Sequence, residues 1–109
     1  MSCMVKICGI NSEDALIAAM SAGADALGYV FFPPSPRHIS LKGAKTLTER
    51  VPNSILKVGL FVEAGDEALE NAITAGSLDV IQLHGKESPE RVAAVKERFG
   101  LKVMKAISV

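Results

Sequence analysis

The chain has 109 residues, of which 49% are hydrophobic and 22% charged, a composition typical of one globular domain and not of a disordered or fibrous chain. Twelve basic residues balance twelve acidic ones, which argues against binding to nucleic acids or anionic membranes, because both need excess positive charge. The longest apolar runs, 15–20 and 27–32, fall far short of the roughly 18 residues that cross a bilayer, and residues 1–10 lack a signal-peptide pattern. We therefore expect a cytoplasmic protein whose partner is a small molecule or another protein.

Strand and helix patterns alternate along the chain. The predicted strands are 4–7, 26–31, 56–61, 80–83 and 102–107. The predicted helices run from Asn11, as N-cap, to Gly23; from Ser40, as N-cap, to about Arg50; from Asp66 to Ala75, closed by Gly76; and from the Ser88-Pro89 pair to Gly100. Repeated strand-helix units with short loops predict a parallel sheet with right-handed crossovers.

Polar or small residues alternate with apolar ones inside these strands. They are Lys6, Cys8, Lys57, Gly59, Gln82, His84 and Lys105. We interpret them as one polar face of the sheet. A barrel interior near the active-site end can hold such groups, whereas the helix-covered faces of an open sheet would leave them unsatisfied at about 1–3 kcal/mol each.

The length of the chain limits how much of a barrel it can form. An eight-stranded barrel needs at least about 200 residues. We therefore predict an α/β fold of the (βα) TIM-barrel type in which residues 1–109 form about half a barrel, four βα units plus a fifth strand, apparently truncated.

The two cysteines have different expected roles. Cys3 and Cys8 are about 16 Å apart in an extended segment at ~3.3 Å per residue, too far for a disulfide, and they have no zinc-type spacing to His38 or His84. We expect no metal site. Cys8 ends the first strand close to a helix N-terminus and to Lys6, which would favour a thiolate acting as base or nucleophile; alternatively it is a small buried hydrophobe.

Two further side chains are candidates at the carboxyl ends of the strands, where parallel βα proteins bind ligands. Arg37 lies in the stiff loop 33–38, where its guanidinium could hold a carboxylate in bidentate fashion, or it is an ordinary surface arginine. His84 ends the fourth strand and could bind a ligand or transfer a proton, or it has a structural role. Dinucleotide, P-loop and serine-hydrolase motifs are absent.

Several motifs together resemble one enzyme family. VKICGI at 5–10, ADALGYVFFPPSPRHIS at 24–40, GLFV at 59–62, VIQLHG at 80–85 and KAISV at 105–109 look like phosphoribosylanthranilate isomerase of the tryptophan pathway. The order and spacing of these motifs cover the whole chain, which corresponds to the first half of the family's eight-stranded barrel. Small departures are His38, where the family usually has Tyr, and Glu63, where Asn is common.

The resemblance implies an Amadori rearrangement of a phosphosugar substrate by acid and base, without a cofactor. It makes Cys8 the general base and Arg37 the ligand of the anthranilate carboxylate, with Gln82 and His84 at substrate-facing positions. The family's general acid, an Asp beyond the fifth strand, and its phosphate-binding loops fall outside this sequence. We therefore expect the chain alone to be inactive.

Two other functions stay open. One is a self-associating half-barrel module without catalysis: both sheet edges, 4–7 and 102–107, would be unpaired, and an apolar interior face with Val30, Phe32, Phe61 and Met104 would be exposed, so we expect homo-oligomers. The sequence does not decide between pairing of edges and burial of interior faces. The other is a different phosphosugar barrel enzyme, which the SPR loop and the CGI motif disfavour.

Overall fold

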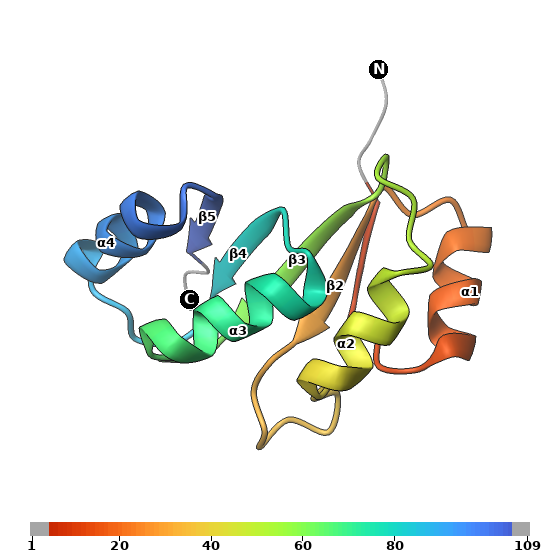
Figure 1. The fold of residues 1–109 in the computed structure, drawn as a ribbon, viewed down its shortest axis with the longest axis horizontal. Helices are drawn as coiled ribbons and strands as arrows, with labels where there is room; N and C mark the ends of the chain where they lie inside the picture. Colours follow the sequence, from red (N-terminus) through yellow and green to blue (C-terminus); the bar gives the residue numbers. More distant parts are fainter. Residues whose placement is uncertain (1–4, 106–109) are drawn as a thin grey trace.

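Five strands and four helices alternate through residues 5–105, the part of the chain that the computed structural model describes (Figure 1). They are β1 (Lys6–Cys8), α1 (Glu13–Ser21), β2 (Ala26–Val30), α2 (Leu41–Thr48), β3 (Leu56–Phe61), α3 (Asp66–Gly76), β4 (Val80–Leu83), α4 (Pro89–Phe99) and β5 (Lys102–Lys105). Cys3, Met4 and residues 106–109 lie outside the described residues. No helix within 5–105 is long and apolar enough to span a membrane.

The strands pair in chain order, β1-β2-β3-β4-β5, and every neighbouring pair is parallel. When each strand lies next to the strand before it in the sequence, right-handed crossovers carry every helix to the same face. All four helices therefore lie on one side of the sheet (Figure 1). A doubly wound sheet reverses its strand order and has helices on both faces. The order therefore agrees with the predicted barrel-type half.

The two faces of the sheet have different surroundings. The helix-covered face holds the main core, which includes Leu27, Tyr29 and Ile81 packed with the helices. We call the opposite side the inward face. By strand register it carries Lys6, Cys8, Ala26, Gly28, Val30, Leu56, Val58, Leu60, Val80, Gln82, Lys102 and Met104.

The expected exposed apolar interior is only partly present. Met104 on the inward face is 43% exposed, whereas Val30 is buried. Phe61 is on the other side: it lies in the helix-covered core and stacks on Phe31 with ring centroids 5.4 Å apart. Phe32 follows β2 and is half-buried.

The predicted single polar face is also partly wrong. Lys6, Cys8 and Gln82 share the inward face, but Lys57 and Lys105 have the register of the helix-covered side. Lys57 is buried there because its ammonium lies 3.4 Å from the carboxylate of Asp79. Gly59 has the same register as Lys57, and a Cβ on it would meet a side chain of the main core. A polar strand residue therefore does not by itself identify the barrel interior.

Helix ends follow local side-chain chemistry. Ser40 and Ser88 accept hydrogen bonds from the backbone N–H three residues later, as predicted. The N-cap of α1 is Ser12 and not Asn11, since the Ser12 hydroxyl accepts from the N–H of Ala15. Gly76 was expected to close α3 but is its last residue, and the C-cap is Ser77 in the left-handed conformation.

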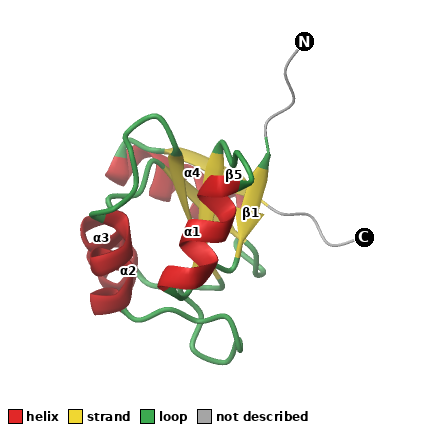
Figure 2. Cartoon of the chain, turned by 90° about the vertical axis from the view of Figure 1, so that its right-hand side faces the viewer, coloured by secondary structure: helices red, strands yellow, loops and turns green. Residues whose placement is uncertain are grey.

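Helices α2 and α3 lie side by side over the sheet in both views (Figures 1 and 2) and are joined by a chain of hydroxyl groups. The Thr48 hydroxyl donates to the Gly76 carbonyl at 2.8 Å. The Thr48 hydroxyl has only one proton, which it gives to Gly76. The Tyr29 hydroxyl, 2.9 Å from the Thr48 oxygen, must therefore donate to Thr48. Burial raises the pKa of Tyr29, so its hydroxyl keeps the proton that it donates. These two hydrogen bonds tie β2 to both helices.

Replacing Thr48 with valine should lower the free energy of unfolding by about 1–3 kcal/mol, because the Tyr29 hydroxyl and the Gly76 carbonyl lose their shared partner. Thr46→Val, on the exposed side of the same helix, should change it by less than about 0.5 kcal/mol. Urea unfolding followed by circular dichroism measures both. Equal midpoints for the two variants would contradict the bridging role of Thr48.

Candidate active site

The thiol of Cys8 lies at the carboxyl end of β1, beside a glycine on the next strand. Cys8 is half-buried and pairs in register with Gly28. A Cβ on Gly28 would lie 2.8 Å from the Cys8 sulfur, so only glycine leaves room for the thiol. The N–H groups of Gly9 and Ile10 both donate to the Gly28 carbonyl at 3.0 Å, which fixes the turn after Cys8.

Arg37 reaches this same turn from the next loop. Gly9 has φ of +85°, and a Cβ on it would lie 2.6 Å from Cδ of Arg37. The arginine stem therefore packs directly on the backbone of Gly9, the residue after Cys8. Arg37 therefore contacts the residue that follows Cys8, although Arg37 and Cys8 are 29 positions apart in the sequence.

The loop that carries Arg37 is held by its own hydrogen bonds. The Ser35 hydroxyl accepts from the N–H of Arg37 at 3.1 Å, and the Ser35 carbonyl accepts from the N–H of His38 at 3.1 Å. The N–H of Ile39 returns to the carbonyl of Val30 at 3.0 Å, so the loop closes on the end of β2. These contacts fix the backbone from which the Arg37 guanidinium projects.

Gln82 is connected to β1 across the inward face. The ammonium of Lys6 donates a hydrogen bond to the side-chain carbonyl of Gln82. Strands β1 and β4 are separated by β2 and β3, and in a flat sheet they would be about 14 Å apart at ~4.8 Å per strand. The sheet must therefore curl toward the inward face, as a barrel wall does.

His84 follows β4 at the same edge of the sheet. Its N–H donates to the carbonyl of Phe61 at 2.8 Å, and the residue is exposed. Within residues 5–105 no hydrogen bond joins its side chain to Cys8, Arg37 or Gln82, so the structure does not bring all four predicted residues into direct contact. No cluster of metal-binding side chains is present in this range.

A carboxylate that the sequence analysis did not single out organises the same edge. Glu87 has a side chain that is 4% exposed. It accepts from the N–H of Glu63 at 2.7 Å, from the N–H of Gly85 at 2.9 Å and from the Lys105 ammonium at 3.0 Å. It thereby links the loops after β3 and β4 to the end of β5.

The protonation of Glu87 reflects these contacts. Burial of the carboxyl raises its pKa, but the hydrogen bonds from Glu63, Lys105 and Gly85 outweigh burial and lower the pKa below its ordinary value of 4.5. The carboxylate is therefore ionised at neutral pH. The Lys105 ammonium also donates to the carbonyl of Gly85, so the turn after His84 is held from both sides.

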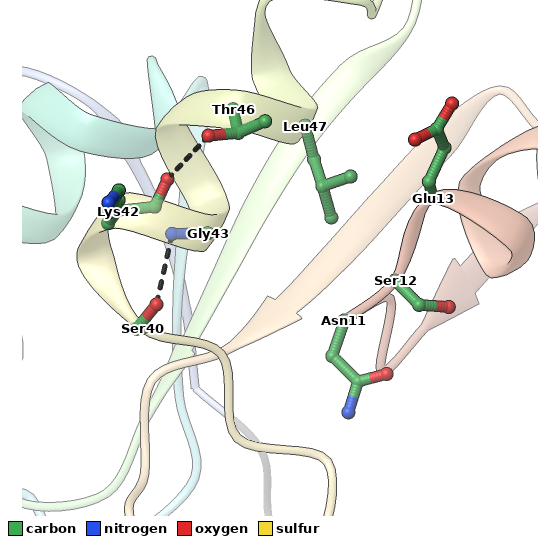
Figure 3. Close-up of a pocket in the computed structure, with 8 residues that line it drawn as sticks. All are labelled: Asn11, Ser12, Glu13, Ser40, Lys42, Gly43, Thr46 and Leu47. Carbon is green, nitrogen blue, oxygen red and sulfur yellow. Dashed lines mark hydrogen bonds between the residues drawn. The ribbon is translucent and has the colours of Figure 1, made fainter.

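A pocket elsewhere in the molecule does not coincide with these residues. It lies between the starts of α1 and α2 and is lined by residues such as Asn11, Ser12 and Lys42 (Figure 3). It contains none of the four predicted site residues. Cys8, Arg37, Gln82 and His84 lie instead along the carboxyl ends of the strands and on the inward face.

Comparison with known proteins identifies the family of this arrangement. A family model described as N-(5'phosphoribosyl)anthranilate (PRA) isomerase matches residues 5–109. The chain belongs to the phosphoribosylanthranilate isomerase family. The N-(5'-phosphoribosyl)anthranilate isomerase of Rhodopseudomonas palustris strain HaA2 is 51% identical over 109 residues, which are all of this chain and 50% of that protein.

Solved structures of phosphoribosylanthranilate isomerases have the same fold over this part. The enzyme from Thermotoga maritima has a TM-score of 0.91 at 35% identity, with 99% of this chain and 52% of that chain covered. The enzyme from Thermus thermophilus has a TM-score of 0.89 at 36% identity, with 98% and 52% covered. The chain therefore spans about half the length of the relatives it matches.

Glu63, which the sequence analysis expected to be a departure from the family pattern, has an unusual backbone conformation. Its φ is +50°, in the left-handed region that asparagine tolerates better than most side chains. The Glu63 side chain also lies against Gly85, where an added Cβ would meet it at 2.9 Å. With glutamate at position 63, the backbone N–H of this residue still donates to the Glu87 carboxylate.

Glu87→Gln should lower the free energy of unfolding by about 1.5–3 kcal/mol at pH 7, because hydrogen bonds to an ionised carboxylate are lost. The folded-state pKa lies below the unfolded value, so the ionised form stabilises the fold above about pH 4.5, and this stabilisation is lost as the pH falls through the lowered pKa. Denaturant titrations from pH 7 to about pH 3 should therefore show the variant and the parent converging in acid.

The matched control is Glu97→Gln on the exposed surface of α4, which should change stability by less than about 0.5 kcal/mol at any of these pH values. A difference between parent and Glu87→Gln that stays constant with pH would contradict the assigned role of the carboxylate.

Proposed function

We propose that a barrel containing this chain is a phosphoribosylanthranilate isomerase. It would catalyse the Amadori rearrangement of N-(5-phosphoribosyl)anthranilate to 1-(2-carboxyphenylamino)-1-deoxyribulose 5-phosphate in tryptophan biosynthesis. The observation that carries the proposal is the packing of Arg37 on Gly9, which places a cation beside the Cys8 strand end in a member of this family. A related isomerase has been solved in complex with reduced 1-(o-carboxyphenylamino)-1-deoxyribulose 5-phosphate, and it is 35% identical to this chain.

In this mechanism the Cys8 thiolate is the general base. It removes the C2′ proton from the ring-opened iminium form of the substrate, and the electron pair of the C–H bond moves toward the iminium nitrogen. The product enolamine then tautomerises to the ketone. The hydrogen is transferred within the substrate skeleton, so the reaction has no need of a redox cofactor.

The other candidate residues hold the substrate. The Arg37 guanidinium pairs with the anthranilate carboxylate, because its planar fork matches the two carboxylate oxygens. Gln82 on the inward face and His84 at the end of β4 are the proposed substrate-binding groups of the fourth strand. By the family pattern, the general acid and the phosphate loops belong to the part of the barrel that this chain does not cover.

The proposal can be tested with a chimera that joins residues 1–109 to the unmatched half of the R. palustris enzyme. The chimera should isomerise the substrate, and Cys8→Ala should reduce turnover by about 10² to 10⁴ because the general base is lost. Cys3→Ala in the same chimera is the control and should keep parental turnover. An active Cys8→Ala chimera under saturating substrate would overturn the assignment of the base.

A second candidate function is supported by the open edges of the sheet. Within residues 5–105, strands β1 and β5 each pair on one side only, and Met104 in β5 is exposed. Unpaired strand edges are templates for further strands. The 109-residue chain by itself would then be a self-associating module without catalysis.

The isolated chain should show no isomerase activity and should self-associate at micromolar concentration. A base without its acid and without phosphate contacts has no complete catalytic route, and the free edges of β1 and β5 recruit further copies. Sedimentation equilibrium and an activity assay on one sample measure both properties. A folded monomer would contradict self-association, and turnover would contradict inactivity.

A further inference from the structure

The inward face of the sheet carries positive charge without negative charge. Two of its positions are lysines, Lys6 and Lys102, both exposed, and none of its positions on the five described strands is acidic. The ion pairs of residues 5–105 use other cations, including Lys57 and Lys105 on the opposite face. The whole chain has equal numbers of basic and acidic residues, but this face has an excess of positive charge.

The position of the Lys6 ammonium makes this imbalance specific. Exposed lysines usually extend their ammonium groups into water. Lys6 instead reaches across the inward face to the neutral side-chain carbonyl of Gln82. This contact runs from β1 to β4, across β2 and β3, whose inward positions include Ala26 and Val58. Within residues 5–105 its acceptor is uncharged.

Completion of a barrel would remove this ammonium from water. The interior of such a barrel is filled with side chains, and the solved relatives contain about twice the length that this chain covers. A desolvated ammonium that has only an amide oxygen as partner is strongly unfavourable, whereas a facing carboxylate would compensate the charge.

We propose that the inward face docks a barrel-completing set of βα units that presents a carboxylate to Lys6. The partner is acidic on its inward surface and apolar around the acidic group. A second copy of this chain fits poorly as the occupant of the inward face, because it would bring another Lys6 and Lys102 to the same interior; the self-association expected of the isolated chain uses the strand edges. The proposal rests on the fold and on charge complementarity, and it does not require that the complex be an isomerase.

The probe is the half of the R. palustris HaA2 isomerase that this chain does not match, co-expressed with the 109-residue chain as a separate tagged polypeptide. Affinity capture, sedimentation equilibrium and calorimetric titration should show a 1:1 complex. Lys6→Met should weaken binding by at least about 100-fold, because the partner carboxylate loses its counter-charge on burial. Lys6→Arg, which keeps the charge, should remain within about tenfold of the parent.

Lys45→Met is the matched control, since Lys45 is an exposed lysine on α2, over the other face, and its replacement should leave the affinity within about threefold. Absence of a 1:1 complex with the unaltered chain, equal binding by the Lys6→Met variant, or assembly of this chain only with itself would each overturn the proposal. A Lys6-dependent complex without isomerase activity would support it while overturning the proposed function.

Discussion

The constraint on which the structure depends is that the strands are ordered as they occur in the chain. Each right-handed crossover then carries its helix to the same side, so one face of the sheet is packed and the other is not. The packed face uses large apolar side chains such as Tyr29 and Phe61, both almost completely buried. The other face is free to hold groups suited to a barrel interior, which is where Cys8, Gln82 and Lys6 are found.

Missing side chains are as important to the candidate site as those present. Gly28 leaves space for the Cys8 thiol, and Gly9 leaves space for the stem of Arg37. Hydrogen bonds to the Gly28 carbonyl fix the first turn, and Ser35 fixes the loop that bears the arginine. Strand pairing, turn geometry and loop geometry thus combine to bring a thiol and a guanidinium from separate βα units to one edge of the sheet.

Helix caps, which depend on neighbouring residues, and the parallel strand-helix architecture, which follows from the repeat, could be predicted from the sequence, whereas individual side-chain pairs between distant residues could not. Ser40 and Ser88 cap helices through groups three residues away, and these caps were correctly expected. Asn11 and Ser12 are both good N-cap residues, so backbone geometry decided which of the two caps α1. The prediction of a single polar face was partly wrong because Lys57 is neutralised by Asp79, 22 residues away. Glu87 was missed because two of its partners are 24 and 18 residues away.

The contact between Arg37 and Gly9 has a consequence for protein engineering. Loops of βα barrels are commonly regarded as exchangeable parts, because each follows its own strand. Here the loop after β2 rests on the backbone of the turn after β1, and an alanine at position 9 would occupy the space of the arginine stem. The two loops therefore form one transplantable module, and a graft of either loop into another barrel would have to carry the glycine and the arginine together.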